Sequence, residues 1–237
     1  MRYLPLCAVF FFAPQLLAQP PLPRYEVKRA ATPIVIDGKP DDKAWAAAGK
    51  IELIFPWDAQ TGAKQKTTAR LLWDDQYLYV AYECEDADIV AFHTERDDPT
   101  YLDDAVEIFL NPMPSQTGIY YGLEMNARAT LYDYTMYQSR YLFKQFNLQG
   151  VKLATFIDGT LNLRGDQDKG WSLEVAIPWA NFDALSKRPV PGAVWSANVN
   201  RWDGVEPNRR MSNWSDPVQP TPNPHVPARF GQLVFVQ

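Results

Sequence analysis

Apolar and polar residues alternate with a period of two in several short runs of the chain, the period expected of a β-strand with one buried face. In residues 171–179, for example, Trp171, Leu173 and Val175 point one way while Ser172 and Glu174 point the other. Each such run is short, rich in β-branched or aromatic residues, and bounded by Gly, Pro, Asn or Asp. We expect strands in residues 68–73, 77–85, 105–110, 120–134, 151–157, 171–179, 195–202 and 231–236.

Helical patterns are few. Residues 40–48 form one short candidate that Asp41 or Asp42 could cap, and residues 179–185 form a second. Many short strands with so little helix predict an all-β fold and argue against alternating βαβ units. We therefore expect an antiparallel β-sandwich of jelly-roll or immunoglobulin-like type, with one or two short helices.

The N-terminal residues have the pattern of a secretory signal peptide. An apolar stretch follows Arg2 and ends at Leu17-Ala18, where a signal peptidase finds a small residue. We expect residues 1–18 to be removed, residues 19–24 to form an extended proline-rich lead, and residues 25–237 to fold as one domain. The mature chain is then secreted or periplasmic, with no membrane span.

Cysteine content and charge narrow the function further. Cys7 lies in the signal segment, so Cys84 is the one thiol of the mature chain and no intrachain disulfide is expected. The net charge is -5, with 23 Lys and Arg against 28 Asp and Glu. This balance provides no basic surface for nucleic acid or anionic lipid, and indicates a neutral or small partner.

Two strands carry polar rows of unusual composition. Amides, a carboxylate and a guanidinium recur at every second residue, which spaces them by about 7 Å. Such a row matches the hydroxyl groups of a sugar when flat aromatic rings stand beside it, although a solvated outer face has the same pattern. One row contains Glu124, Asn126 and Arg128, and the other contains Ser196, Asn198, Asn200 and Trp202.

Five motifs occur in the order seen in family 9 carbohydrate-binding modules and their DOMON-related relatives. The chain resembles that family from Ile34 to Val236. Each motif is weak alone, but five in order are fairly specific. They are PIVIDGKPDDKAW, LLWDDQYLYVAYECED, DDAVEIFLNP, WSLEVAIPW and the C-terminal pair NWSDP and FGQLVF.

The resemblance implies a β-sandwich that binds carbohydrate, often at a chain end, without cleaving it. Such modules commonly assist glycoside hydrolases, so a separate hydrolase is an expected partner in polysaccharide catabolism. The resemblance also implies a clamp of two aromatic rings, here Tyr101 and Trp214. Its polar partners are Glu107, Asn126, Asn198 and Asn200, together with Glu124, which stands where relatives commonly have a basic residue.

Each of these residues also has a structural interpretation. Trp214 could cover the open end of the sandwich, and Glu107 could form a structural ion pair. Asp103 and Asp104 are candidate calcium ligands, because hard oxygen donors in a loop suit that ion and relatives often carry it. Asn213-Trp214-Ser215 fits the N-glycosylation pattern, which matters only in a eukaryotic secretory pathway.

Two other functions remain open at this point. A glycoside hydrolase needs paired carboxylates, for which Asp104, Glu107 and Glu124 are candidates. A b-type haem domain needs axial ligands such as methionine and histidine. The available residues are Met113, Met125, Met136, Met211, His93 and His225, which show no zinc-ligand spacing and no indicated pairing.

Overall fold

The computed structural model describes residues 19–205, 207 and 209–237, so the signal peptide predicted for residues 1–18 lies outside the described residues. The described chain is built from thirteen strands, and its only helical segments are short 3-10 turns. The strands are β1 Arg24–Arg29, β2 Ile51–Glu52, β3 Thr67–Trp73, β4 Tyr77–Glu85, β5 Ala105–Asn111, β6 Ile119–Asn126, β7 Leu131–Tyr137, β8 Tyr141–Phe143, β9 Lys152–Asp158, β10 Gly170–Pro178, β11 Val194–Asp203, β12 Arg210–Asn213 and β13 Gly231–Phe235.

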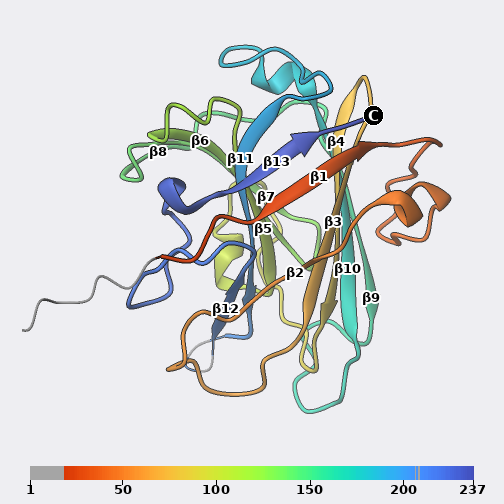
Figure 1. Ribbon diagram of the computed structural model, residues 1–237. Coiled ribbons are helices and arrows are strands. Elements are labelled where there is room, and N and C mark those ends of the chain that lie inside the picture. Colours follow the sequence, from red (N-terminus) through yellow and green to blue (C-terminus); the bar gives the residue numbers. More distant parts are fainter. Residues whose placement is uncertain (1–18, 206, 208) are drawn as a thin grey trace, which may run out of the picture.

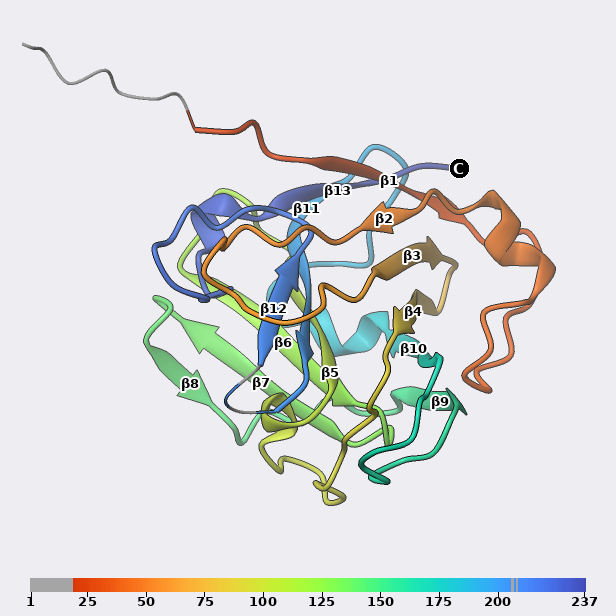
Figure 2. The same ribbon diagram turned by 90° about the horizontal axis from the view of Figure 1, so that it is seen from below.

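The strands follow one continuous order, β8-β7-β6-β5-β11-β13-β1-β3-β4-β10-β9, with β12 beside β11 and β2 beside β3. The sheet curls on itself into a half-barrel, with β8 and β9 at its two ends (Figures 1 and 2). Strand β1 joins the two arms, because it pairs in parallel with both β13 and β3. The expectation of a purely antiparallel fold is therefore wrong at β1, where local alternation carries no information on the direction of the partner strand.

One apolar core fills the inside of the curl. It takes fully buried side chains from both arms, including Leu71 of β3 and Val80 of β4 on one side. Val106 of β5 and Val199 of β11 meet them from the other side. The buried thiol of Cys84 belongs to this core, where burial raises its pKa to about 12.

The outer face of β11, β5, β6 and β7 has a second, smaller apolar cluster. Phe109, Tyr120, Tyr134 and Phe230 are buried in it. Along β5 and β6 the predicted alternation is confirmed, since apolar side chains enter the inner core while Glu107 and Glu124 occur on the same outer row. This face carries the site described below.

Three local expectations change. The two predicted helices are 3-10 turns, η1 Lys43–Ala47 and η3 Trp179–Phe182. Asp42 precedes η1 without capping it, because its carboxylate accepts a hydrogen bond from the Val35 backbone. The single run expected over residues 120–134 is the hairpin of β6 and β7, which turns near Ala129 at φ 61°. No helix in the described part of the chain is long and apolar enough to cross a membrane.

Candidate functional site

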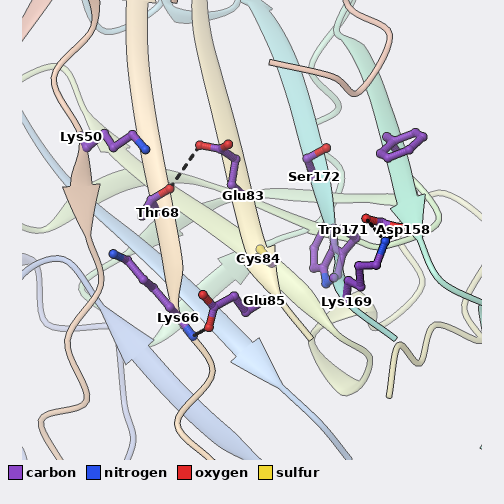
Figure 3. Close-up of a pocket in the computed structure, with 12 residues that line it drawn as sticks. Lys50, Lys66, Thr68, Glu83, Cys84, Glu85, Asp158, Lys169, Trp171 and Ser172 are labelled. Atoms are coloured by element: carbon purple, nitrogen blue, oxygen red, sulfur yellow. Dashed lines mark hydrogen bonds and ion pairs between the residues drawn. The ribbon is translucent and has the colours of Figure 1, made fainter. Parts of the chain in front are cut away.

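One hollow lies on the outer face of β3, β4, β10 and β9 and encloses about 410 Å³ (Figure 3). Thr68, Glu83 and Ser172 stand on one cross-strand row at its floor. Its charged side chains pair across the surface, as Lys169 does with Asp158 at 3.3 Å. Such exposed pairs contribute little and are well solvated, so this groove has the character of an ordinary polar sheet face.

The second hollow encloses about 300 Å³ on the outer face of β11, β5, β6 and β7. It combines three aromatic rings with two carboxyl groups, an association of apolar walls and a few polar groups that is typical of small-molecule sites. We call it the aromatic pocket. Its lining residues are Tyr101, Glu107, Glu124, Tyr132, Leu142, Trp202, Pro222, Asn223, Pro224 and His225.

A single polar row crosses the floor of the aromatic pocket. Strand register aligns Asn213, Asn200, Glu107, Glu124 and Tyr132 on β12, β11, β5, β6 and β7. The Asn213 amide donates to Asn200 at 2.6 Å, and the Asn200 amide donates to Glu107 Oε2 at 3.2 Å. These hydrogen bonds link neighbouring strands of the sheet. The carboxyl group of Glu107 is therefore held in place before any ligand arrives.

The two carboxyl groups are directly opposite each other and almost completely buried, at 1% exposure for Glu107 and 3% for Glu124. Burial raises the pKa of Glu107 to about 7, against the opposing effects of Arg209 and of hydrogen bonds from Asn200 and Trp202. Burial, and then the charge of Glu107, raise the pKa of Glu124 well above its ordinary value. At neutral pH the pair therefore retains at least one proton.

Glu124 has one bound and one unbound oxygen. The Tyr134 hydroxyl donates to Oε1 at 2.7 Å, while no described residue donates to the buried Oε2. Tyr134 reaches this position across Gly122, where a Cβ atom would lie 2.3 Å from the tyrosine ring. Glycine is thus required at residue 122 for the hydrogen bond that orients Glu124.

The walls of the aromatic pocket are rings that contact one another or a cation. The Tyr101 and Tyr132 rings meet edge to face with centroids 5.8 Å apart. The guanidinium of Arg209 lies 3.8 Å from the centroid of Trp202, and Lys144 Nζ lies 4.9 Å from that of Tyr132. Both cations face the carboxyl pair, since each lowers the pKa of Glu124.

The loop before β13 closes one side of the pocket through His225. Its ring stacks on Phe109 with centroids 4.9 Å apart, and its Nδ1 hydrogen-bonds the Tyr120 hydroxyl at 2.8 Å. Burial lowers the pKa of His225 to about 4. The imidazole is therefore neutral at neutral pH and adds no charge to the site.

Trp214 is not at the aromatic pocket. Its half-buried ring packs against the inner core and meets Tyr25 edge to face, with centroids 6.5 Å apart. A Cβ atom at residue 231 would lie 2.7 Å from the Trp214 ring, so Gly231 makes room for it. The structure therefore gives Tyr101 a different neighbour from the expected Trp214, because the tryptophan that shares a pocket with Tyr101 is Trp202.

Two of the expected polar partners organise loops beside the pocket. Asn126 binds the 127–130 turn, since its Oδ1 accepts hydrogen bonds from the Arg128 and Thr130 backbones at 3.0 Å. Asn198 binds Ser215 through both its amide nitrogen and its oxygen, and so fixes the chain beyond Trp214. Neither side chain lines the pocket, whereas Asn200 supports it through Glu107.

Asp103 and Asp104 have different partners in the fold. The Asp103 carboxylate accepts hydrogen bonds from His93 and Asn126 and from two backbone amides. Asp104 instead lies in a buried cluster with Asp86 and Asp203.

The guanidinium of Arg201 bonds both Asp86 and Asp203, at 2.8 and 2.9 Å. Because Arg201 supplies positive charge to the cluster and Asp104 accepts two backbone hydrogen bonds, the residues present fit a calcium ion poorly.

Other candidate residues are engaged in the fold. Met125 and Met211 are fully buried, while His93 hydrogen-bonds Asp103 and His225 hydrogen-bonds Tyr120, so both imidazoles already have partners in the fold. The Asn213 side chain is fully buried, which closes it to glycosylation in the folded chain.

Residues missed by the sequence reasoning include Trp202, Tyr132 and His225. For Trp202 the signal was present, because it shares the parity of Asn198 and Asn200, but the clamp was assigned to Tyr101 and Trp214 instead. His225 is carried by a proline-rich loop, and no local pattern indicates where such a loop docks.

Comparison with known proteins places the chain among carbohydrate-binding modules. It is 26% identical over 205 residues to the endo-1,4-beta-xylanase A of Thermotoga neapolitana, covering 86% of this chain and 17% of that enzyme. It is 28% identical over 186 residues to the exoglucanase XynX of Acetivibrio thermocellus, covering 77% of this chain and 15% of that enzyme. The chain thus spans about one sixth of the length of these relatives.

Solved structures share the fold. A putative carbohydrate-binding protein from Bacteroides uniformis aligns with a TM-score of 0.74 at 19% identity, over 91% of this chain and all of that one. A family 9 module from Caldicellulosiruptor kristjanssonii, solved in complex with cellotriose, aligns with a TM-score of 0.61 at 21% identity, over 90% and 93% of the two chains. The model of the carbohydrate family 9 binding domain-like family matches residues 36–237, and the chain belongs to this family.

Proposed function

We propose that this protein is an exported, non-catalytic carbohydrate-binding protein that holds a sugar unit in the aromatic pocket. The observation that carries the proposal is the buried row of Asn200, Glu107 and Glu124 beneath the rings of Tyr101 and Trp202. A pyranose presents an apolar face of C–H groups and a rim of hydroxyls, and the pocket offers aromatic rings for the first and fixed acceptors for the second. Trp202 takes the place in the clamp that the sequence reasoning gave to Trp214.

The pocket volume of about 300 Å³ supports recognition of one sugar unit at a time. This value is at the lower end of the range for small-molecule sites. Binding of a chain end suits such a pocket better than binding along a chain. The family match and the relatives, which are xylan- and glucan-degrading enzymes by name, support a role beside a glycoside hydrolase.

A glycoside hydrolase is the second candidate, because Glu107 and Glu124 are opposite each other in one pocket. Catalysis of that kind needs one ionised carboxylate and one acid on either side of the scissile bond. Here both carboxyl groups belong to the same floor, and burial raises the pKa of both. This arrangement favours binding, and release of reducing sugar that disappears in Glu107→Gln would reverse the choice.

A glycan array tests the binding function. We expect the chain without residues 1–18 to be retained on sugars, and Tyr101→Ala to lose most of that retention. Tyr141→Ala is the matched control, because Tyr141 is an exposed tyrosine of β8 that does not line the aromatic pocket. Equal retention by both variants would contradict the assignment of the site.

A further inference from the structure

The two carboxyl groups at the floor of the aromatic pocket repel each other whenever both are ionised. Glu107 and Glu124 are directly opposite on neighbouring antiparallel strands, where Cβ atoms lie about 5 Å apart and like charges destabilise the sheet. Both side chains are buried, so water does not screen the repulsion. A proton relieves it in the free protein, and a ligand that carries positive charge relieves it equally well.

Hydrogen-bond donors are also lacking at this point. Glu107 receives donors from Asn200 and Trp202, and Glu124 Oε1 receives the Tyr134 hydroxyl. Glu124 Oε2 is buried without a donor from any described residue, although Glu124 lines the pocket. A buried acceptor of this kind costs free energy until a partner donates to it, so a ligand that donates to this atom gains affinity.

The surrounding rings already show the geometry of cation binding. Lys144 Nζ lies over Tyr132, and the Arg209 guanidinium lies over Trp202. Electron-rich ring faces attract cations, and more strongly where water is excluded. Lys144 is exposed and Arg209 is part-exposed, so both belong to the rim, whereas the two carboxyl groups form the buried floor. His225, on the remaining side, is neutral at neutral pH.

We propose that the preferred ligand is an amino sugar whose protonated amine binds the carboxyl groups of Glu107 and Glu124 beneath the rings of Tyr101, Tyr132 and Trp202. This inference rests on the proposed function and narrows it to glycans with free amino groups. An ammonium group carries three donors and one positive charge, so it satisfies Glu124 Oε2 and separates the two carboxylates. A hydroxyl at the same ring position supplies only the donor.

Three disaccharides with one β-1,4-linked glucose skeleton test the inference. Cellobiose carries a hydroxyl at carbon 2, N,N′-diacetylchitobiose an acetamide, and the glucosamine disaccharide an ammonium. Titration calorimetry at neutral pH and moderate salt should give an affinity for the glucosamine disaccharide at least tenfold above that for cellobiose. Equal or tighter binding of cellobiose would overturn the amino-sugar inference and leave the proposed sugar-binding function in place.

Variants locate the source of the preference. Glu124→Gln keeps an acceptor for Tyr134 but removes the charge, and we expect the ratio of the two affinities to lose its tenfold preference, whatever the absolute affinity for cellobiose. Glu85→Gln is the matched control, because Glu85 is an exposed glutamate in the groove of Figure 3. A preference that survives Glu124→Gln would overturn the inference. Absence of binding to all three disaccharides, and to every sugar of the array, would instead overturn the proposed function itself.

Discussion

Replacing Glu107 by glutamine should change how the stability of the protein depends on pH. Burial raises the pKa of Glu107 from 4.5 to about 7 in the folded state. In the unfolded chain the pKa of this carboxyl group is about 4.5. Its contribution to stability is fully present below pH 4.5 and is lost as the pH rises through the folded-state pKa of about 7. The wild-type free energy of unfolding should therefore fall across this interval.

The size of the effect follows from the two pKa values. The rise from 4.5 to about 7 corresponds to roughly 3 kcal/mol, at about 1.4 kcal/mol for each pKa unit. Glutamine cannot ionise, so the variant lacks this loss. The difference in free energy of unfolding between wild type and Glu107→Gln should change by about 3 kcal/mol between pH 4.5 and pH 8, in favour of the variant at the higher pH.

Urea unfolding followed by tryptophan fluorescence at several pH values measures this difference. Asp104 titrates in the same interval, since its pKa is raised to about 8, but it is present in both proteins and cancels. For the control Glu85→Gln, at an exposed site, the free energy of unfolding should depend on pH as it does in the wild type. Parallel curves for Glu107→Gln as well would refute the view that a buried, proton-binding carboxyl pair forms the pocket floor.

Three further outcomes follow from single contacts. Gly122→Ala places a Cβ 2.3 Å from the Tyr134 ring. It should cost roughly 2 kcal/mol of stability, measured by urea unfolding, and most of the affinity for sugar. Unchanged stability and affinity would mean that the ring has room to move. Trp214→Ala should cost about 2 kcal/mol, because a half-buried ring leaves the edge of the core, and a loss of sugar binding without loss of stability would return Trp214 to the site. Because Arg201 supplies charge to the Asp86, Asp104 and Asp203 cluster, chelation by EDTA should leave the thermal midpoint unchanged, and a drop would show that the cluster holds a metal ion.

Strand parity was the part of the sequence that predicted structure well. It put Glu107, Glu124 and Asn200 on the faces where the structure has them, because alternation is a property of each strand and needs no knowledge of its partners. The same argument could not give the parallel pairing of β1, which depends on segments at the other end of the chain.

The aromatic wall shows the limit of motif reasoning. Trp202 and Trp214 are twelve positions apart, and both lie next to polar residues of the expected floor. Their separation is decided by tertiary contacts: Gly231 and Tyr25 accept the Trp214 ring against the core, while Arg209 stacks on Trp202 at the pocket rim. Such contacts involve distant segments, so the sequence pattern alone does not distinguish the two rings.

Titration calorimetry of Trp202→Ala beside Phe156→Ala shows which of the two hollows binds sugar, with cellobiose and its glucosamine counterpart as ligands. Trp202 lines the aromatic pocket, and Phe156 is an exposed ring in the other hollow. Removing an aromatic ring that anchors a ligand costs about 2 kcal/mol, which is roughly a 30-fold loss of affinity. We expect that loss for Trp202→Ala and wild-type affinity for Phe156→Ala. Loss of binding in Phe156→Ala with retention in Trp202→Ala would contradict it.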